Sequence, residues 1–554
     1  MPRSPADDTE ALRKARGAFF TPEPVARYVT AWAVRSATDR VLEPSCGEAA
    51  FLLAAHERQR QLAARANDDA IGSLDGVELH DVSARSARAL LRAAGAEPKI
   101  KVGDFFAERP TALYDAVIGN PPYVRYQAFS GEHRIRSRAA ALRGGVALTA
   151  LASSWAAFTV HSALFLKPGG RLGLVLPAEL LSVNYAADVR RFLMQRFGRV
   201  RLVLFTERVF RGVLEEVVLL LAEGQGPTDH CELVQVRDAS ELAGVTGPFS
   251  TWTPNDIAGK WTSALIPSAA AGTYTELLND GGFSPLQTWG ETTLGMVTGA
   301  NRYFALSPQR VAELRIPRQE LLPLSPPGSR HLRGLSFTSA MRNQLGEGGA
   351  ATWLFRPPGE PSPGSRAYIA DEENRPGGVY HAYKCRVRTP WWRVPLVKTA
   401  DLLLTYMNAD TPRLTTNAAA ARHLNSVHGV YLREQYRQIG RQLLPLASLN
   451  SATLLGAETV GRAYGGGMLK IEPREADALP VPGPETIAAA RSGLTRVRAQ
   501  VAGQLRAGRL REAVRLVDEI VLVRELGLGR ADVAGLAEAH QRLMARRVAR
   551  GGNP

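Results

Sequence analysis

A buried-strand pattern that stops on two consecutive prolines restricts this chain more than any other feature. The segment YDAVIGNPPYVRYQ covers residues 114–127, and its apolar part ends just before Asn120. Pro121 and Pro122 each fix a φ angle and each lack a backbone N–H donor, so they cannot continue a sheet. The residues from Asn120 to Tyr123 are therefore predicted to form a stiff hook at the end of a strand.

Short apolar runs alternate with helical patterns over the first 225 residues. Strands are predicted at residues 40–42 and 76–79, and a helix is predicted at 82–94. The segments KIKVGDFF, SSWAAFTVHSALFL and GGRLGLVLP continue the alternation. Alternation of this kind is typical of a parallel α/β sheet with helices on its faces. The predicted fold is α/β, with a doubly wound, mostly parallel sheet.

The pattern changes after about residue 245. Pro- and Gly-rich pieces such as FRPPGEPSPGSR interrupt short, irregular strands, and a helical tail follows LPVPGPE. With 554 residues, the chain is long enough for several domains of about 150 residues each. Three domains are predicted, at residues 1–245, 246–484 and 485–554: the doubly wound sheet, a mixed α/β domain and a helical C-terminal segment.

The composition limits which partners the protein can bind and in which cellular compartment it is expected. The formal net charge is +15 and Arg outnumbers Lys, which favours a polyanion such as nucleic acid, although a GC-rich genome would also raise the Arg content. The three scattered cysteines match neither a disulfide framework nor a zinc site, so no metal is predicted. The N-terminus has no apolar signal region and no run could span a membrane. A cytoplasmic protein without membrane contact is expected.

Acidic residues stand at the ends of the first three predicted strands, where ligands bind in parallel sheets. Glu43 and Glu78 end the first and second strands, and Asp104 follows the third. A carboxylate after the second strand can accept both hydroxyls of a ribose, and Asp104 can accept from an adenine amino group. The phosphate-binding pattern G-x-G-x-x-G is absent, which favours a nucleoside without a pyrophosphate. S-adenosylmethionine fits this description.

The hook supplies the matching chemistry. The exocyclic amino nitrogen of adenine is a poor nucleophile because its lone pair is delocalised into the ring. The side-chain carbonyl of Asn120 and the backbone carbonyl of Pro121 can accept both N–H bonds and so direct that lone pair towards a methyl donor. Tyr123 is predicted to offer a ring face to a base that has left the duplex.

The motifs and their order resemble those of the gamma class of amino-group DNA methyltransferases, in particular the TaqI-like N6-adenine enzymes. The matching segments in chain order are GAFFTPEPVARYVTAWAV, VLEPSCGEAAFL, GVELHD, GDFF, GNPPY and VFRGVLEEVVLLLAEG. The resemblance covers nearly the whole chain. It implies the class I fold of S-adenosylmethionine-dependent methyltransferases.

The resemblance also assigns roles to single residues. The implied catalytic residues are Asn120, Pro121, Pro122 and Tyr123, with the flipped base between Tyr123 and Phe210. The implied cofactor-binding residues are Thr21, Glu43, Ser45, Cys46, Gly47, Glu78, Leu79, Asp104, Phe105 and Phe158. The chain departs from the family pattern where Glu48 and Ala49 replace a second glycine, and where Ser153 stands in place of the usual Asp or Asn.

The C-terminal half also resembles the family, through segments such as PWWRVP and YMNADTPRLTTNAAAARHLNSVHGVYL. This similarity implies that residues from about 250 to 480 form a target recognition domain that reads the DNA sequence. The Arg-rich stretch after the hook is predicted to be a mobile loop that orders on DNA, or alternatively a solvated charge run. Its candidate DNA-binding residues are Arg125, Arg134, Arg136 and Arg138.

The predicted function is site-specific transfer of a methyl group from S-adenosylmethionine to the N6 amine of adenine in double-stranded DNA. The main alternative is an N4-cytosine DNA methyltransferase, because the same hook can serve either amine. A protein glutamine methyltransferase, which would leave the large basic C-terminal half and Phe210 unexplained, and an RNA methyltransferase are less favoured alternatives. The expected form is a monomer, either an orphan methylase or a member of a restriction-modification system whose cognate restriction endonuclease acts separately.

Overall fold

The computed structural model describes residues 21–67, 69–124, 131–150, 152–207, 209, 216–245, 247, 249–254 and 256–551. The chain divides into two compact units, one ending at Leu265 and the other beginning at Ile266. Throughout the described residues, no helix combines the length and the apolar character needed to cross a membrane.

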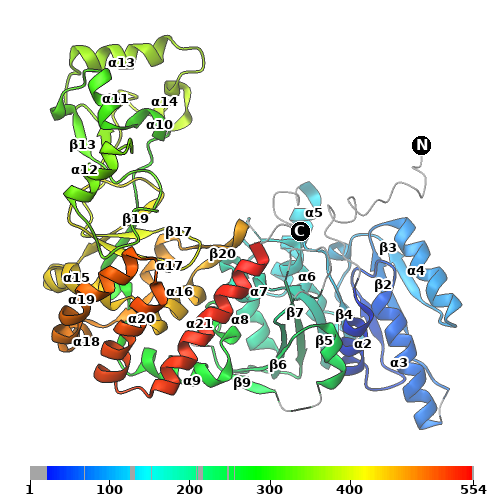
Figure 1. The fold of residues 1–554 in the computed structure, drawn as a ribbon. Helices are drawn as coiled ribbons and strands as arrows, with labels where there is room; N and C mark the ends of the chain where they lie inside the picture. The colour runs from blue at the N-terminus through cyan, green and yellow to red at the C-terminus, as the bar shows by residue number, and fades with distance from the viewer. Residues whose placement is uncertain are drawn as a thin grey trace. The chain divides into compact units, whose positions relative to one another are not determined.

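The first unit is built on one large sheet (Figure 1). Within its described part, nine strands pair in the order β3-β2-β1-β4-β5-β7-β6-β8-β9. The strands are β1 (Val41–Glu43), β2 (Leu74–Glu78), β3 (Lys99–Val102), β4 (Tyr114–Gly119), β5 (Leu166–Pro177), β6 (Arg199–Phe205), β7 (Val217–Glu223), β8 (Cys231–Val236) and β9 (Ser250–Trp252). Strands β3 to β5 of this order are parallel, and β7 is antiparallel to both of its neighbours. The predicted doubly wound, mostly parallel sheet is confirmed.

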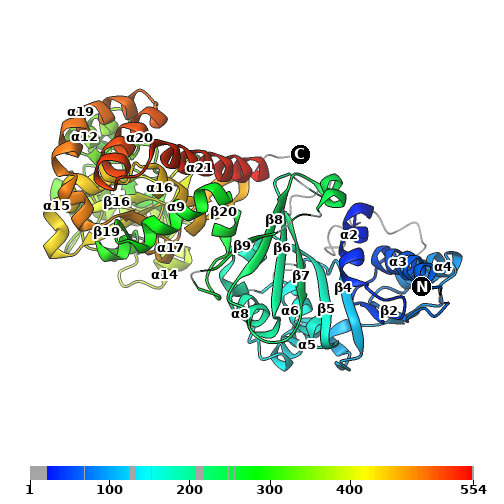
Figure 2. The ribbon, with the colours of Figure 1, turned by 90° about the horizontal axis from the view of Figure 1, so that it is seen from below.

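Helices cover both faces of this sheet. They are α2 (Glu23–Ala33), α3 (Ala50–Ala66), α4 (Asp81–Ala93), α5 (Gly131–Arg143), α6 (Ser154–Ala163) and α8 (Ala187–Arg196). Figure 2 shows α2 and α3 on one face and α5, α6 and α8 on the other. Because helices cover both faces, central strands such as β4 are buried on both sides. This burial explains why the sequence of β4 is a continuous apolar run and does not alternate.

The second unit contains several smaller sheets. The largest pairs β11 (Gly290–Leu294), β19 (Val427–Leu432), β16 (Leu402–Thr405), β18 (Leu414–Asn417) and β14 (Ser336–Phe337) in that order. Another pairs β12 (Ala305–Leu306), β15 (Trp353–Phe355) and β13 (Leu321–Pro323), near α11 (Pro308–Glu313) and α13 (Pro363–Asn374). Trp391 and Trp392 belong to the apolar core around this second sheet. The short, irregular strands predicted here are therefore observed.

The C-terminal helices belong to the second unit. They are α15 (Glu434–Ala447), α16 (Ser451–Val460), α19 (Arg491–Arg506), α20 (Leu510–Asp518) and α21 (Arg530–Gly551). Helix α19 packs against α15, and α21 packs against α16. The expected separate segment 485–554 thus shares its core with the residues before it. The break between the units falls after the expected residue 245 because β9 pairs with β8 in the first sheet.

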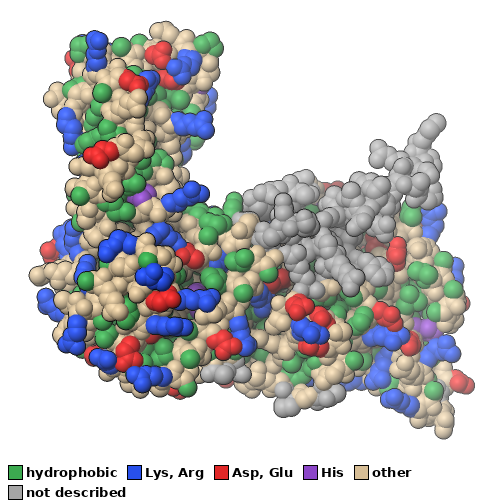
Figure 3. All heavy atoms as spheres, viewed as in Figure 1, with side chains coloured by type: hydrophobic (Ala, Val, Ile, Leu, Met, Phe, Trp, Pro, Cys, Tyr) green, Lys and Arg blue, Asp and Glu red, His purple; other side chains and the backbone are tan. Residues whose placement is uncertain are grey.

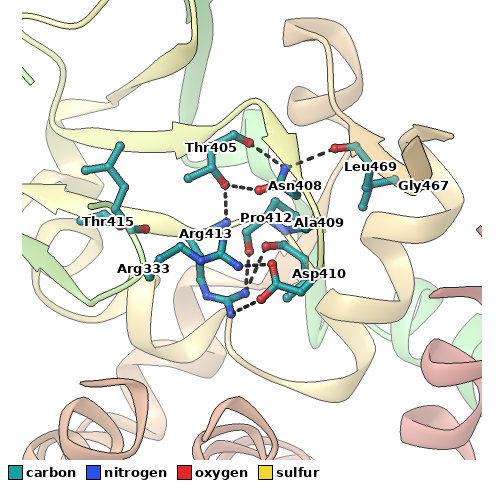
Figure 4. A network of polar contacts seen from close by, with 12 residues as sticks. Arg333, Thr405, Asn408, Ala409, Asp410, Pro412, Arg413, Thr415, Gly467 and Leu469 are labelled. Carbon is teal, nitrogen blue, oxygen red and sulfur yellow. Dashed lines mark hydrogen bonds and ion pairs between the residues drawn. The ribbon is translucent and has the colours of Figure 1, made fainter. Parts of the chain in front are cut away.

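A buried polar network lies between β16 and β18 (Figure 4). Arg413 is only 4% exposed, and its guanidinium donates to the carbonyl of Thr411 at 3.1 Å and to Asp410 at 3.1 Å. Its backbone N–H donates to the hydroxyl of Thr405 at 2.8 Å. Arg333 forms a second ion pair with Asp410. Burial lowers the pKa of Arg413 to about 10, so the side chain stays charged at neutral pH and needs these acceptors.

Candidate functional site

The hook follows β4 directly, as predicted, and its side chains are tied to each other and to the unit's core. The amide Nδ2 of Asn120 donates to the hydroxyl of Thr21 at 3.2 Å. The hydroxyl of Tyr123 lies 2.7 Å from Oδ1 of Asn120 and 3.0 Å from the carbonyl of Val175 on β5. Thr21, which the resemblance places at the cofactor, is buried beside the hook.

Tyr123 is largely buried in this conformation, and its stacking on a flipped base stays a prediction. The residue is only 7% exposed. The physical reason is that its hydroxyl finds two acceptors inside the unit, Asn120 and Val175.

Ser154, the first residue of α6, holds the second half of the hook. Its hydroxyl bonds to the carbonyl of Pro122 and lies 2.9 Å from the backbone N–H of Val124. The backbone N–H of Ser154 donates to the carbonyl of Val124 at 3.1 Å. The carbonyl of Pro121, by contrast, accepts no hydrogen bond from any described residue. The hook therefore presents one backbone acceptor that no described residue uses.

Two of the three predicted acids meet at the turn after β1. Glu78 accepts from the backbone N–H of Gly47 and of His80, both at 2.9 Å. Glu43 accepts from the backbone N–H of Leu52 at 3.2 Å. Burial raises the pKa of Glu43 well above its usual range, and the nearby charge of Glu78 adds to the rise. The negative charge of Glu78 therefore acts on the carboxyl group of Glu43.

The turn between these acids gives a ligand access to the backbone. Cys46 is buried, and its N–H donates to the carbonyl of Val77 at 3.0 Å. Gly47 has a positive φ of 48°, and no heavy atom of another described residue, its chain neighbours apart, lies within 4 Å of the position that a Cβ would take there. Ser45 precedes this turn in the chain, and Leu79 at the end of the second strand is 50% exposed.

Ala49, where the chain departs from the family's glycine pattern, adopts a left-handed backbone with φ 65°. Only glycine adopts this region freely, and an L-residue there costs roughly 1–2 kcal/mol. The N–H of Ala49 donates to the carbonyl of Cys46 at 2.6 Å, which closes the turn. The departure therefore falls on a position where the backbone is strained.

The third acid, Asp104, is shared between two elements. Its Oδ1 accepts from the backbone N–H of Phe106 at 3.0 Å, and its Oδ2 lies 2.9 Å from Nδ1 of His133 on α5. Phe105 follows Asp104, and its ring stacks on that of Phe158 from α6 with centroids 5.7 Å apart and planes 7° apart. The structure therefore brings Asp104, Phe105 and Phe158 together, and their role as one side of a nucleoside site stays a prediction.

The Arg-rich stretch after the hook was predicted to be either a mobile loop that orders on DNA or a solvated charge run, and its residues Gly131–Arg143 form the helix α5. The helix forms because Ser137, Ala140 and Ala141 make a small, buried stripe that packs on α6. The arginines turn back onto the protein: Arg134 donates to the carbonyl of Ala150, Arg138 to that of Leu148, and Arg136 pairs with Glu132. Arg125 and Phe210 lie outside the described residues.

Sequence reasoning missed three residues of this site, namely Ser154, His133 and His161. The adjacent serines at the start of α6 are a signal for Ser154, because serine is common at helix N-termini. His133 was hidden in the charged stretch, where only the arginines drew attention. His161 lies on α6, and its ring is 4.8 Å from that of Phe105 and 5.1 Å from that of Phe165.

Replacing His161 by phenylalanine is expected to weaken the pH dependence of stability. Burial, with the charge of Arg143, lowers the pKa of His161 from 6.5 to about 4. The unfolded chain therefore binds this proton at higher pH than the folded protein, so folded stability is complete above about pH 6.5 and falls as the pH drops towards 4. When the pH is lowered from 7 to 5, the unfolding free energy of the wild type should fall by roughly 1–2 kcal/mol more than that of His161→Phe. Denaturant unfolding at the two pH values measures this, and equal losses would contradict it.

Two family models match the chain one after the other. The model described as N-6 DNA Methylase matches residues 7–258. The model described as Type II methyltransferase M.Eco57I, C-terminal domain matches residues 258–522. Their common boundary lies close to the division of the structure after Leu265.

Relatives of similar length match most of the chain. The Type II methyltransferase M.XamI of Xanthomonas campestris pv. amaranthicola is 28% identical over 505 residues, which cover 85% of this chain and 86% of the relative. The Type II methyltransferase M.AccI of Acinetobacter calcoaceticus is 23% identical over 473 residues, 84% of each chain. Among solved structures, the Type IIL restriction-modification enzyme MmeI in complex with DNA aligns over 94% of this chain and 74% of that one, with a TM-score of 0.51 and 11% identity. At this identity the match shows a shared fold only.

Proposed function

Because the chain belongs to the N-6 DNA methylase family and is an adenine DNA methyltransferase of the restriction-modification type, we propose that it methylates the exocyclic N6 amine of adenine in double-stranded DNA at one short sequence. The observation that carries this proposal is the hook at the end of β4. In this hook Pro121, whose carbonyl accepts from no described residue, follows Asn120 directly in the chain, which supports the proposal.

The residues around β1 to β4 fit S-adenosylmethionine. Glu78 and Asp104 are carboxylates at the ends of neighbouring strands, and carboxylates accept from ribose hydroxyls and from an adenine amino group. The open space over Gly47 allows a ligand to approach the backbone closely. No phosphate-binding glycine pattern stands there, in agreement with a nucleoside that carries no pyrophosphate.

S-adenosylmethionine supplies an electrophilic methyl group on a sulfonium. We assign the remaining work to the hook, which aligns the target nitrogen and polarises it. Oδ1 of Asn120 and the carbonyl of Pro121 accept from the two N–H bonds of the amine and so concentrate its lone pair on the incoming methyl group. Ser154 fixes Pro122 and Val124, which keeps these two acceptors in place. Tyr123 and Phe210 are the proposed rings on either side of the flipped base.

Recognition of the DNA sequence is assigned to the second unit. For the chain as a whole, the proposed functional parts are residues 1–245 for catalysis, 246–484 for target recognition and 485–554 as a helical C-terminal segment. The C-terminal family model and the positive charge of the chain support this assignment. On the face that Figure 3 draws, Lys and Arg side chains are spread among acidic and apolar ones and do not form a single stripe. The proposed DNA contacts of Arg134, Arg136 and Arg138 would require these side chains to leave their present partners. A monomer is proposed, together with a cognate restriction endonuclease that acts separately.

The product of the reaction tests the proposed function. DNA incubated with the full-length protein and S-adenosylmethionine is digested to nucleosides and analysed by mass spectrometry. N6-methyladenine is the expected product, with none in a reaction that lacks the cofactor. N4-methylcytosine as the sole product would favour the alternative, which the match to the N-6 family model does not support. Methylated protein or RNA beside unmodified DNA would contradict the function altogether.

A further inference from the structure

A cavity of about 920 Å³ lies in the second unit. It is bounded by α16, α20, α21, the loop at Asp410 and a π-helix at Glu519–Glu525. Figure 1 shows α16, α20 and α21 side by side, and they pack on one another. Pockets of about 300–1,000 Å³ are typical of small-molecule sites, and π-helical turns are frequent at functional sites. The methyl-transfer chemistry proposed above uses none of these elements.

The walls of the cavity are mainly apolar. Val514 projects from α20, and Val533, Ala537 and Met544 project from α21. Leu454 of α16 completes this surface. Walls of this kind favour a ring or a hydrocarbon chain, because burial of apolar surface supplies most of the binding energy for small ligands.

Unpaired positive charge lines the same cavity. Arg511 and Arg515 stand one helical turn apart on α20, so they lie on the same face. Most other charged groups of the lining are already satisfied: Arg530 by Glu519, Glu538 by Arg542, Asp518 by Ser451, and Asp410 by Arg333 and Arg413. Within residues 256–551, Arg509, Arg511, Arg515 and Glu512 form no ion pair, and Asp518 bonds to the neutral Ser451. Three guanidinium groups against the carboxylates of Glu512 and Asp518 favour an anionic ligand.

A buried polar atom also lacks a partner at this cavity. His540 lines it and is only 8% exposed. Its Nε2 has no hydrogen-bond partner among the described residues. A buried nitrogen without a partner is unfavourable, and buried polar groups of native proteins are nearly always bonded. A ligand in the cavity would supply the missing partner.

From these observations we infer that the cavity binds a small organic anion with an apolar ring or chain. Its acidic group lies between Arg511 and Arg515, its apolar part packs against Val533 and Ala537, and one of its polar atoms bonds to His540. This site is separate from the methyl-transfer site in chemistry and in the residues it uses, and the inference goes beyond the proposed function. The ligand is an effector or a stabilising molecule and not a substrate.

Anilinonaphthalene sulfonate, an apolar ring system with one sulfonate, is a direct probe of such a site. Titrated into the full-length protein, the dye is expected to bind at one saturable site with a rise in fluorescence. The double variant Arg511→Gln and Arg515→Gln should raise the dissociation constant of the dye about tenfold or more, because its charge-assisted hydrogen bonds to the two arginines are lost. Ala537→Trp should abolish saturable binding by filling the cavity. Arg496→Gln, on an exposed position of α19 outside the cavity, is the matched control and should bind like the wild type.

A competition experiment and the variants together show whether the dye binds in the cavity or elsewhere on the protein. Saturating S-adenosylmethionine should leave dye binding unchanged, because the proposed cofactor residues are in the first unit. Displacement of the dye by S-adenosylmethionine would overturn the inference, as would an unchanged dissociation constant in the double arginine variant. Both arginines are exposed, so their replacement leaves the core intact and this result is decisive even if Ala537→Trp does not fold.

Discussion

Methyl transfer by the Asn120→Ala variant is expected to be at least about 100-fold slower than by the wild type, because loss of one preorganised acceptor of this kind typically costs about 10²–10³ in rate. The substitution removes Oδ1, one of the two proposed acceptors for the target amine, and leaves the carbonyl of Pro121 in place. Binding of DNA and of S-adenosylmethionine should persist, since the acids at β1 to β3 are untouched. Single-turnover transfer of a radiolabelled methyl group measures the rate.

Tyr123→Phe is the matched control for this variant. It removes the hydroxyl that bonds to Oδ1 of Asn120 but keeps both proposed acceptors and the aromatic ring. Its rate should stay within about tenfold of the wild type. A near wild-type rate for Asn120→Ala would exclude the proposed role of the side-chain carbonyl. Equal, large losses in both variants would show that Asn120 acts only through its bond to Tyr123.

Removal of Arg413 is expected to have the second large effect, on stability. Arg413→Ala should lower the unfolding free energy of the second unit by about 3 kcal/mol, because it leaves a cavity in the core and deprives two buried carbonyls and Asp410 of a donor. The matched variant is Arg333→Ala. Arg333 pairs with the same carboxylate, but its side chain is 35% exposed, and exposed ion pairs typically contribute about 0–1 kcal/mol.

Urea unfolding followed by tryptophan fluorescence compares the two variants. Two transitions are expected, because the two units have separate cores, and only the transition of the second unit should shift. Equal losses in Arg413→Ala and Arg333→Ala would show that burial does not decide the strength of this network. If Arg413→Ala instead shifted only the transition of the first unit, the proposed contribution of the network to the stability of the second unit would be wrong.

The first unit could be predicted well from the sequence because parallel strands that are buried on both faces are encoded by continuous apolar runs. Continuous apolar runs indicated the strands, and an acidic residue stands at or just after the end of each of the first three: Glu43, Glu78 and Asp104. Carboxyl ends of neighbouring parallel strands meet at one edge, so the meeting of Glu43 and Glu78 at the turn after β1 followed from the order of elements. The boundaries of single strands differed from the prediction by one or two residues.

The details that the sequence did not reveal depend on contacts between distant elements. The inward position of Tyr123 requires Val175 of β5, and the tie between Asp104 and His133 requires α5 to fold onto α6. Helix α5 itself was obscured because its buried stripe consists of small residues, which add little apolar signal among many arginines. In the second unit, Arg413 gave no sign of its burial, because a charged residue is usually exposed.

The position of β1 in the middle of the sheet has a consequence for how the protein is made. During synthesis Glu43 leaves the ribosome long before Asn120, yet β1 must pair with β2 on one side and with β4 on the other before the acids and the hook meet. Parallel pairings between distant segments form slowly, since a long loop must close before any contact is gained. Until then the apolar strands β1 and β2 have an exposed edge and are prone to aggregate. Slow production at low temperature, or with chaperones, should therefore raise the yield of active protein more than a stronger promoter would.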